Sequence, residues 1–305
     1  MLRVTSNMMN SQLLLNLNRN ARTMNDTQLQ LASGRKINKP SDDPVGITYS
    51  LRYRAELSSN EQYTKNVDSA LSWLDYNDTV LGQAGDVVQR LRELTVKAST
   101  GSNPQSALDS INAEVMQLKE QLVDISNSKL NGKYIFNGEQ YNTKPYDYAK
   151  GTDGTYDTTQ PVITDFGQIQ YVVGEGVQMP INMTGNDVFG HTGEADNLFS
   201  IINSISEGLK SGNIEAVSGQ LDNIDTRVET LLSARSEIGA KTNRVELMQD
   251  RLSDLNINLT DLQAKTEDAD YEALIMQSKI QENIYNASLS VGAKIISTTL
   301  VDFIR

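Results

Sequence analysis

Apolar side chains recur along most of this chain in alternating steps of three and four residues, the spacing that places them along one narrow face of an α-helix. Three such stripes lie in the first half of the chain. The first runs through Leu14, Leu17, Ala21, Met24, Gln28 and Leu31, the second from Val67 to Ala98, and the third from Leu108 to Ile125. Narrow stripes of this kind are typical of helices that pack on other helices in a coiled coil.

The second half of the chain carries two more stripes. One runs from Ile214 to Leu262 with a slip of register after Val245, and as a single helix it would be about 70 Å long. A helix of that length cannot bury itself, so we expect it to lie against the helices of the first half. The last stripe contains Ala273, Met276, Ile280, Ile284, Ala287 and Val291. Glu267, Asp268 and Asp270 precede it, where the first turn of a helix favours negative charge.

Between residues 133 and 190 the pattern changes to an alternation with a period of two, in segments rich in Gly, Tyr, Val and Thr. Asp153-Gly154 predicts a hairpin turn, because a type I′ turn needs positive φ at both central residues. The sequence therefore predicts a mainly α fold with a β-rich insertion (α+β). The N- and C-terminal halves would form a long antiparallel coiled-coil bundle, with the small β module at the middle of the chain.

This arrangement divides the chain into three predicted parts. Residues 1–43 and 268–305 would form a terminal coiled-coil assembly domain, and residues 44–132 with 191–267 a helical rod domain. Residues 133–190 would form a β-rich outer domain.

Charge and composition exclude several classes of function. The net charge of −12 disfavours nucleic acid and anionic membranes as partners, since both are negatively charged. The chain has no Cys, which excludes disulfides and thiolate catalysis, and a single His excludes zinc motifs with paired histidines. No apolar run approaches the roughly 18 residues of a membrane span, and the first residues do not form a secretory signal peptide. We expect a cytoplasmic protein or one exported without signal cleavage.

The segment "LASGRKINKPSDDPVG", residues 31–46, interrupts the helical pattern with features of a connector. Gly34 would supply the left-handed residue that ends a helix, and Asp43 would accept hydrogen bonds from the free amides of the next helix, with Pro44 at its first position. Pro40 and Pro44 would stiffen the segment, and Arg35, Lys36 and Lys39 would be available to acidic patches on neighbouring subunits. Asp42 and Asp43 could be read as an acid–base pair, but adjacent residues at a helix start do not face each other across a cleft, so we favour capping.

Other candidate sites are weak. His191 lies in "FGHTGEAD" without a second His or a nucleophile motif, so we predict a loop residue. The tripeptide "DFG" at 165–167 has no kinase elements around it, and "DGTYD" lacks the ligand pattern of a calcium loop. We therefore predict no catalytic residue, no metal site, no cofactor and no small-molecule substrate.

The quoted connector resembles the N-terminal signature of the flagellin superfamily, and "EDADYEALIMQSKIQENIYNASLSVGAKI" resembles its C-terminal region. Shorter segments agree in type and order: "NGKYIFNGE", "INMTGNDVFG" and "SARSEIGAKTNRVE". "MLRVT" at the start, the proline pair in "NKPSDDPVG" and the final "VDFIR" are similar to the hook–filament junction branch of the superfamily. Gly46 stands where the family usually has Ala, and Gly in a helix costs about 1 kcal/mol relative to Ala.

The resemblance implies a structural adaptor of the bacterial flagellum that joins hook to filament and is required for motility. Its implied partners are the first hook-associated protein, flagellin, further copies of itself in a ring, and a cytoplasmic export chaperone. It implies export through the flagellar type III channel and an extracellular location. A short or minor flagellin that forms the filament itself is the main alternative. An enzyme carried on the β module is a distant one.

The terminal stripes are the predicted assembly interface. Its residues are Leu14, Leu17, Ala21, Met24 and Leu31 with Ile280, Ile284, Ala287, Val291 and Ile295. Two helices with such narrow stripes are marginal in water on their own. We therefore hypothesise that the termini are frayed in the monomer and fold on assembly, where their apolar faces meet each other and neighbouring subunits.

Overall fold

The computed structural model describes residues 6–100, 103–151, 154–160, 162 and 164–301, with the side chains of α1 described from Met8 and those of α8 up to Lys294. In these residues the chain forms eight helices and four short strands. In chain order they are α1 (Ser6–Ser33), α2 (Pro44–Ser99), α3 (Gln105–Ser126), β1 (Lys129–Leu130), β2 (Lys133–Tyr134), β3 (Gln170–Gly174), β4 (Val177–Pro180), α4 (Gly185–Phe189), α5 (Leu198–Ser211), α6 (Ile214–Ser218), α7 (Leu221–Glu267) and α8 (Tyr271–Val301). The predicted fold class is confirmed: long helices dominate, and two small antiparallel sheets lie mid-chain.

The chain divides into two compact units. The first combines Met1–Ser59 with Asp254–Arg305, and the second is Asn60–Ser253. The three-part division predicted from the sequence, with boundaries at 43 and 268 and a separate domain at 133–190, stays a prediction. None of the helices that the structure describes is long and apolar enough to span a membrane.

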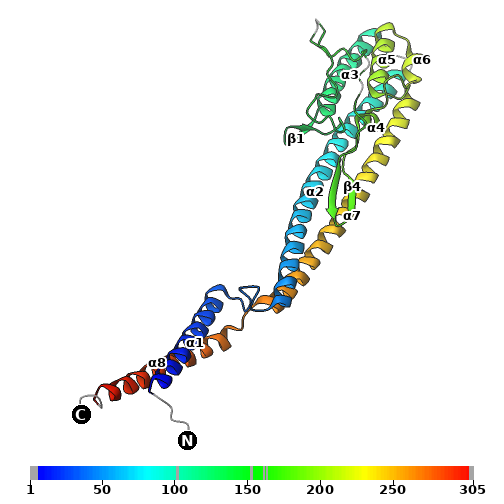
Figure 1. Ribbon diagram of the computed structural model, residues 1–305. Coiled ribbons are helices and arrows are strands. Elements are labelled where there is room, and N and C mark those ends of the chain that lie inside the picture. The colour runs from blue at the N-terminus through cyan, green and yellow to red at the C-terminus, as the bar shows by residue number, and fades with distance from the viewer. Residues whose placement is uncertain (1–5, 101–102, 152–153, 161, 163, 302–305) are drawn as a thin grey trace. The chain divides into compact units, whose positions relative to one another are not determined.

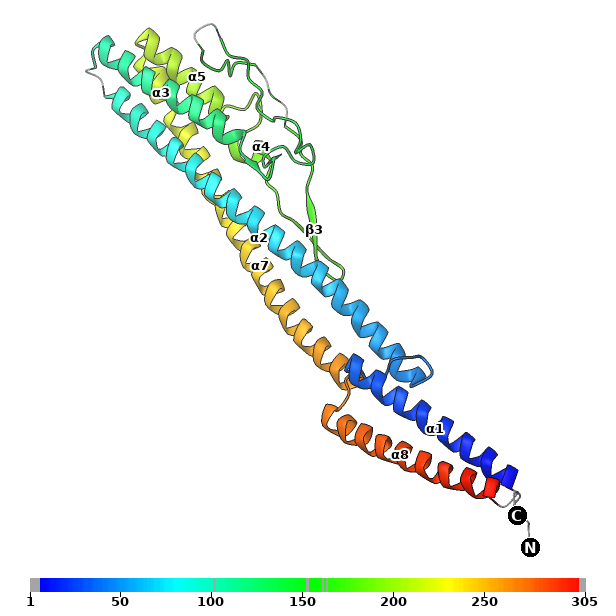
Figure 2. The ribbon, with the colours of Figure 1, turned by 90° about the vertical axis from the view of Figure 1, so that its left-hand side faces the viewer.

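In the second unit α2 and α7 lie side by side (Figure 2). The polar links between the two helices include the paired hydrogen bonds from Arg92 to Asp225 and from Arg235 to Asp78. Every member of the predicted α2 stripe is buried: Val67, Ala70, Leu74, Asn77, Leu81, Ala84, Val88, Leu91, Thr95 and Ala98. The helical period in this stretch therefore identified buried positions correctly, although the buried face is wider and also includes Trp73, Val80, Val87 and Leu94.

The predicted continuous stripe from Ile214 to Leu262 is interrupted in the structure. α6 ends at Ser218, Gly219 follows it, and α7 begins at Leu221. The sequence suggested that Glu267 lies in the first turn of a new helix, and the structure corrects this. Glu267 is the last residue of α7, and α8 begins at Tyr271 after Asp270, whose side chain accepts the Ala273 amide at 3.1 Å.

The middle of the chain holds two separate antiparallel pairs, β1 with β2 and β3 with β4. The strands are short, and most of the chain between β2 and β3 has no regular secondary structure. Asp153 of the predicted hairpin turn lies outside the described residues, whereas Gly154 has a φ of +79° and Lys150 pairs with Tyr156 on either side of it. An aromatic cluster anchors this region: Phe136, Tyr146, Phe189 and Phe199.

In the first unit α1 and α8 lie side by side (Figure 1). The connector of residues 34–43 follows α1, and the first turns of α2 and the last turns of α7 complete the unit. Among the described residues the unit buries only three large apolar side chains, Ile37, Leu259 and Leu274.

Candidate assembly site

The face of α1 that meets α8 follows the predicted stripe closely. Leu17, Ala21, Met24 and Leu31 are half-buried, and so is Leu13, which the sequence reasoning did not include. Leu14 was expected on this face, yet its side chain is 60% exposed. The contact is shallow: among the described side chains of α1, only that of Thr27 is buried.

The face of α8 that meets α1 differs from the predicted one. Its members repeat at heptad spacing and are mostly small or polar: Leu274, Ser278, Gln281, Tyr285, Ser288 and Gly292. Gly292 is buried against Leu13, and a Cβ at this position would lie 2.9 Å from Leu13 Cδ2. Asn20 Nδ2 donates to Ser288 Oγ at 3.5 Å. We call these six residues the α8 seam.

The α8 seam is poorly satisfied as a polar interface. Gln281 Oε1 on α8 and Asn10 Oδ1 on α1 are buried without a hydrogen-bond partner among the described residues. A buried acceptor left in this state costs about 1–3 kcal/mol. The α1–α8 pair is therefore held weakly by its own contacts.

The predicted α8 stripe lies on an adjacent face, one residue before successive positions of the α8 seam and so about 100° round the helix, and it is exposed. Ile280 is 51% exposed, Ile284 47% and Val291 51%, and Ala287 between them is exposed as well. Ile295 belongs to the same prediction, and its side chain lies outside the described residues. Met276 extends this stripe towards the start of the helix, and Ile275 is exposed on another face. The two predicted terminal stripes thus do not face each other, and α8 presents most of its apolar side chains to solvent.

The connector is built as a set of caps. Gly34, with a φ of +70°, ends α1 and donates its amide to Gln30 O at 2.9 Å. Pro40 lies in a turn closed by the Asp42 amide and Lys39 O at 2.9 Å. Asp42 Oδ2 accepts the amides of Asn38 and Lys39, and these two hydrogen bonds, Lys39 first, hold the pKa of Asp42 below its usual range.

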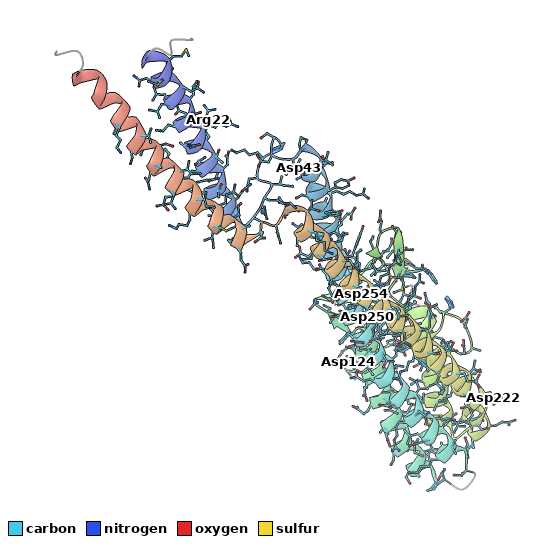
Figure 3. All side chains as sticks on the ribbon, turned by 90° about the horizontal axis from the view of Figure 1, so that it is seen from below. Arg22, Asp43, Asp124, Asp222, Asp250 and Asp254 are labelled. Atoms are coloured by element: carbon cyan, nitrogen blue, oxygen red, sulfur yellow. The ribbon has the colours of Figure 1, made fainter. Side chains whose placement is uncertain are left out.

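Asp43 caps α2 (Figure 3). Its Oδ1 accepts the amides of Val45 at 3.0 Å and Gly46 at 2.9 Å, and Pro44 occupies the first position of the helix. Gly46 has a packing reason here, because a Cβ would lie 2.6 Å from Cδ1 of buried Ile37. Gly at position 46 lowers the helix propensity of α2, but it allows Ile37 of the connector to pack closely against the helix.

The basic residues of the connector are used within the chain. Arg35 Nε lies 3.7 Å from Glu267 Oε1, and Lys39 Nζ lies 3.8 Å from Asp26 Oδ1. Lys36 Nζ donates to Lys265 O at 3.0 Å. The sequence analysis expected these basic side chains to contact neighbouring subunits, whereas the structure shows them in contact with groups of the same chain.

Glu267 is the buried charge at this place, with 2% of its surface exposed. Its carboxylate accepts hydrogen bonds from Ser50 Oγ and Arg54 Nη2, both on α2, and from Gln263 Nε2 at 2.6 Å. Burial raises the pKa of Glu267, but the hydrogen bonds from Ser50, Arg54 and Gln263 and the charge of Arg54 outweigh it and lower the pKa overall. Sequence reasoning missed this residue, since its partners on α2 are more than 200 positions away.

His191 lies apart from this site, in the second unit. Its exposed ring stacks on Phe166 with centroids 5.6 Å apart. Buried Arg227 lies near it and is fixed by Asp196, whose backbone oxygen accepts Arg227 Nε at 3.0 Å and whose carboxylate pairs with Nη2. The residues that the structure describes contain no group of three or more His, Asp or Glu side chains placed to hold a metal ion.

Comparison with known proteins finds similarity to proteins of the bacterial flagellum. Residues 4–141 match the family model of the bacterial flagellin N-terminal helical region. The chain is 26% identical over 274 residues to flagellar hook-associated protein 3 of Escherichia coli K12, covering 85% of this chain and 86% of that protein. The chain therefore contains a region that matches the flagellin N-terminal helical family, and most of its length is similar to hook-associated protein 3.

Two further proteins show how wide the likeness is. Flagellin of Bacillus subtilis 168 is 27% identical over 257 residues, which cover 79% of each chain. The crystal structure of a flagellar junction protein from Legionella pneumophila shares the fold, with a TM-score of 0.53 at 17% identity over 73% of this chain and all of that one. The chain is thus flagellin-like in sequence and largely helical in fold.

Proposed function

We propose that this chain is the structural adaptor that joins the flagellar hook to the filament. The observation that carries the proposal is the exposed apolar face of α8, in a chain that resembles hook-associated protein 3 along 85% of its length. An adaptor needs such a face, because a surface left open in the monomer can be covered by neighbouring subunits. Burying one aliphatic side chain of this size contributes about 1.5–3 kcal/mol.

The proposed partners follow from this role. The first hook-associated protein lies on the hook side, flagellin on the filament side, and further copies of the chain beside it in a ring. The chain is proposed to leave the cell through the flagellar type III channel, held before export by a cytoplasmic chaperone, and to act outside the cell. The poorly satisfied α8 seam favours this route, since a weakly held helix pair unfolds easily for export and gains its missing burial on assembly.

A short or minor flagellin is the second candidate. The likeness to Bacillus subtilis flagellin, at 27% identity over 79% of each chain, favours it specifically. The two candidates differ in what the chain binds: an adaptor connects two different assemblies, whereas a flagellin extends its own.

Stepwise assembly in solution tests the proposal. Polymers of the first hook-associated protein are incubated with this chain, washed, and then supplied with flagellin monomers. We expect filaments to grow from these polymers only when the chain has been added first. Filament growth that does not depend on the chain would contradict the adaptor role.

A further inference from the structure

The carboxylate of Glu267 connects segments that are far apart in the sequence. Arg35 comes from the connector, Ser50 and Arg54 from α2, and Gln263 from α7. With its side chain 97% buried by contact with these groups, Glu267 has little access to water. The carboxylate is therefore held by protein donors on both of its oxygens.

The backbone on either side of Glu267 pairs with the connector. Lys36 N donates to Glu267 O at 2.8 Å, and Ala269 N donates to Gly34 O at 3.0 Å. Arg35 and Asp268 thus face each other as the non-hydrogen-bonded pair of an antiparallel bridge, between these two backbone hydrogen bonds. α1 ends immediately before this bridge and α8 begins shortly after it, at Tyr271.

The bridge therefore joins the chain at the C-terminal end of α1 to the chain at the N-terminal end of α8, which we call the base of the pair. Beyond it, the α1–α8 contact relies on the α8 seam, where Asn20 donates to Ser288 at 3.5 Å and the acceptors of Asn10 and Gln281 have no hydrogen-bond partner among the described residues. A pair held so weakly along its length depends on how firmly its base is fixed. Around Glu267 the base has charge-assisted hydrogen bonds, which are about twice as strong as neutral ones.

We propose that Glu267 is a positioning residue for assembly, a latch that fixes the connector to the α7–α8 junction and so sets α8 in place with its apolar face outward. The inference rests on the proposed function, because the face that it positions is the proposed assembly surface. The latch can open without disturbing the second unit, since its side-chain partners all belong to the first. With the latch closed, α1 and α8 are paired and ready for assembly; with it open, the terminal helices come apart.

Hydrogen exchange on the full-length monomer tests the latch independently of the proposed function. Glu267→Gln removes the charge and keeps the shape, and Glu272→Gln makes the same change at an exposed position on α8. In E267Q we expect the amides of Lys36 and Ala269 to lose at least tenfold of their protection, with no change in residues 60–253. E272Q should match the unmodified chain. Equal protection of Lys36 and Ala269 in E267Q and E272Q would overturn the proposal.

A redox-controlled rescue separates positioning from any other role of Glu267. The chain has no Cys, so Arg35→Cys with Asp268→Cys introduces a single possible disulfide, and a non-hydrogen-bonded antiparallel pair, whose side chains lie close together, suits its geometry. In the E267Q background we expect this pair to restore binding to polymers of the first hook-associated protein when oxidised and to lose it again when reduced. Restored protection without restored binding would overturn the positioning role. If the unmodified chain itself fails to bind, the proposed function fails, while the exchange experiment still decides the latch.

Discussion

Asp43 and Glu267 are carboxylates of the same unit in opposite environments. Asp43 is exposed and caps the first amides of α2, whereas Glu267 is buried and accepts donors from α2 and α7. The first position is visible in the sequence, because an Asp-Pro pair before a helical stripe is a local signal. The second is not, because nothing near Glu267 indicates that Ser50 and Arg54 will reach it.

Removing the cap should loosen the start of α2. Asp43→Ala leaves the amides of Val45 and Gly46 without their acceptor, and the loss of such a cap costs about 1 kcal/mol. We expect the free energy of local opening at these two amides, measured by hydrogen exchange, to fall by that amount. Ser41→Ala in the same turn is the control and should change neither amide. An unaltered opening free energy in D43A would show that the cap contributes nothing.

The contribution of Glu267 to stability should be lost in acid. Because its pKa is lowered in the folded chain, folding favours the ionised form, so its contribution is complete above the usual pKa of Glu and disappears as pH falls through the lowered value. The difference in the free energy of unfolding between the unmodified chain and E267Q should therefore shrink from pH 7 towards pH 3. Asp42, whose pKa is also lowered, is present in both proteins and cancels. A difference that stays constant with pH would contradict this account.

At the scale of elements, helical periodicity predicts the buried face of α2 but not that of α8. In α2 one heptad face is apolar and the helix has one buried face, so the pattern and the burial agree. α8 has two faces at similar spacing, an apolar one and one of Ser, Gln, Tyr and Gly, and it is the second that meets α1. Sequence reasoning chose the apolar face. The neighbour of a helix within the chain depends on tertiary contacts such as the fit of Gly292 to Leu13, which periodicity does not contain.

The two faces of α8 should respond differently to substitution. Ile280→Ser with Ile284→Ser changes only exposed positions, so the free energy of unfolding should stay within about 0.5 kcal/mol while binding to polymers of the first hook-associated protein is lost. Leu274→Ala changes the buried base of the α8 seam and should lower that free energy by about 2 kcal/mol or more. Chemical denaturation and a sedimentation binding assay measure the two effects. Undiminished binding of the double variant would remove the exposed stripe from the assembly surface.

At the scale of the whole molecule, the two units differ in how they are stabilised. The second unit holds the apolar core, including the aromatic cluster of Phe136, Phe189 and Phe199. The first unit buries only Ile37, Leu259 and Leu274 among its described large apolar residues and depends on caps, the Glu267 latch and the α8 seam. The sequence predicted the long helices of both units and the site of the connector, but not α4 or α5. Its three-part division followed composition, whereas the compact units follow contacts between distant segments.

Self-assembly of the purified full-length chain in high sulfate, followed by light scattering and electron microscopy, tests the central claim most directly. Sulfate strengthens apolar burial and so favours growth of any polymer that the exposed α8 face can form with further copies. The adaptor account predicts monomers or short oligomers that nevertheless bind the ends of polymers of the first hook-associated protein. Long filaments formed by this chain alone would identify a flagellin and contradict the adaptor role.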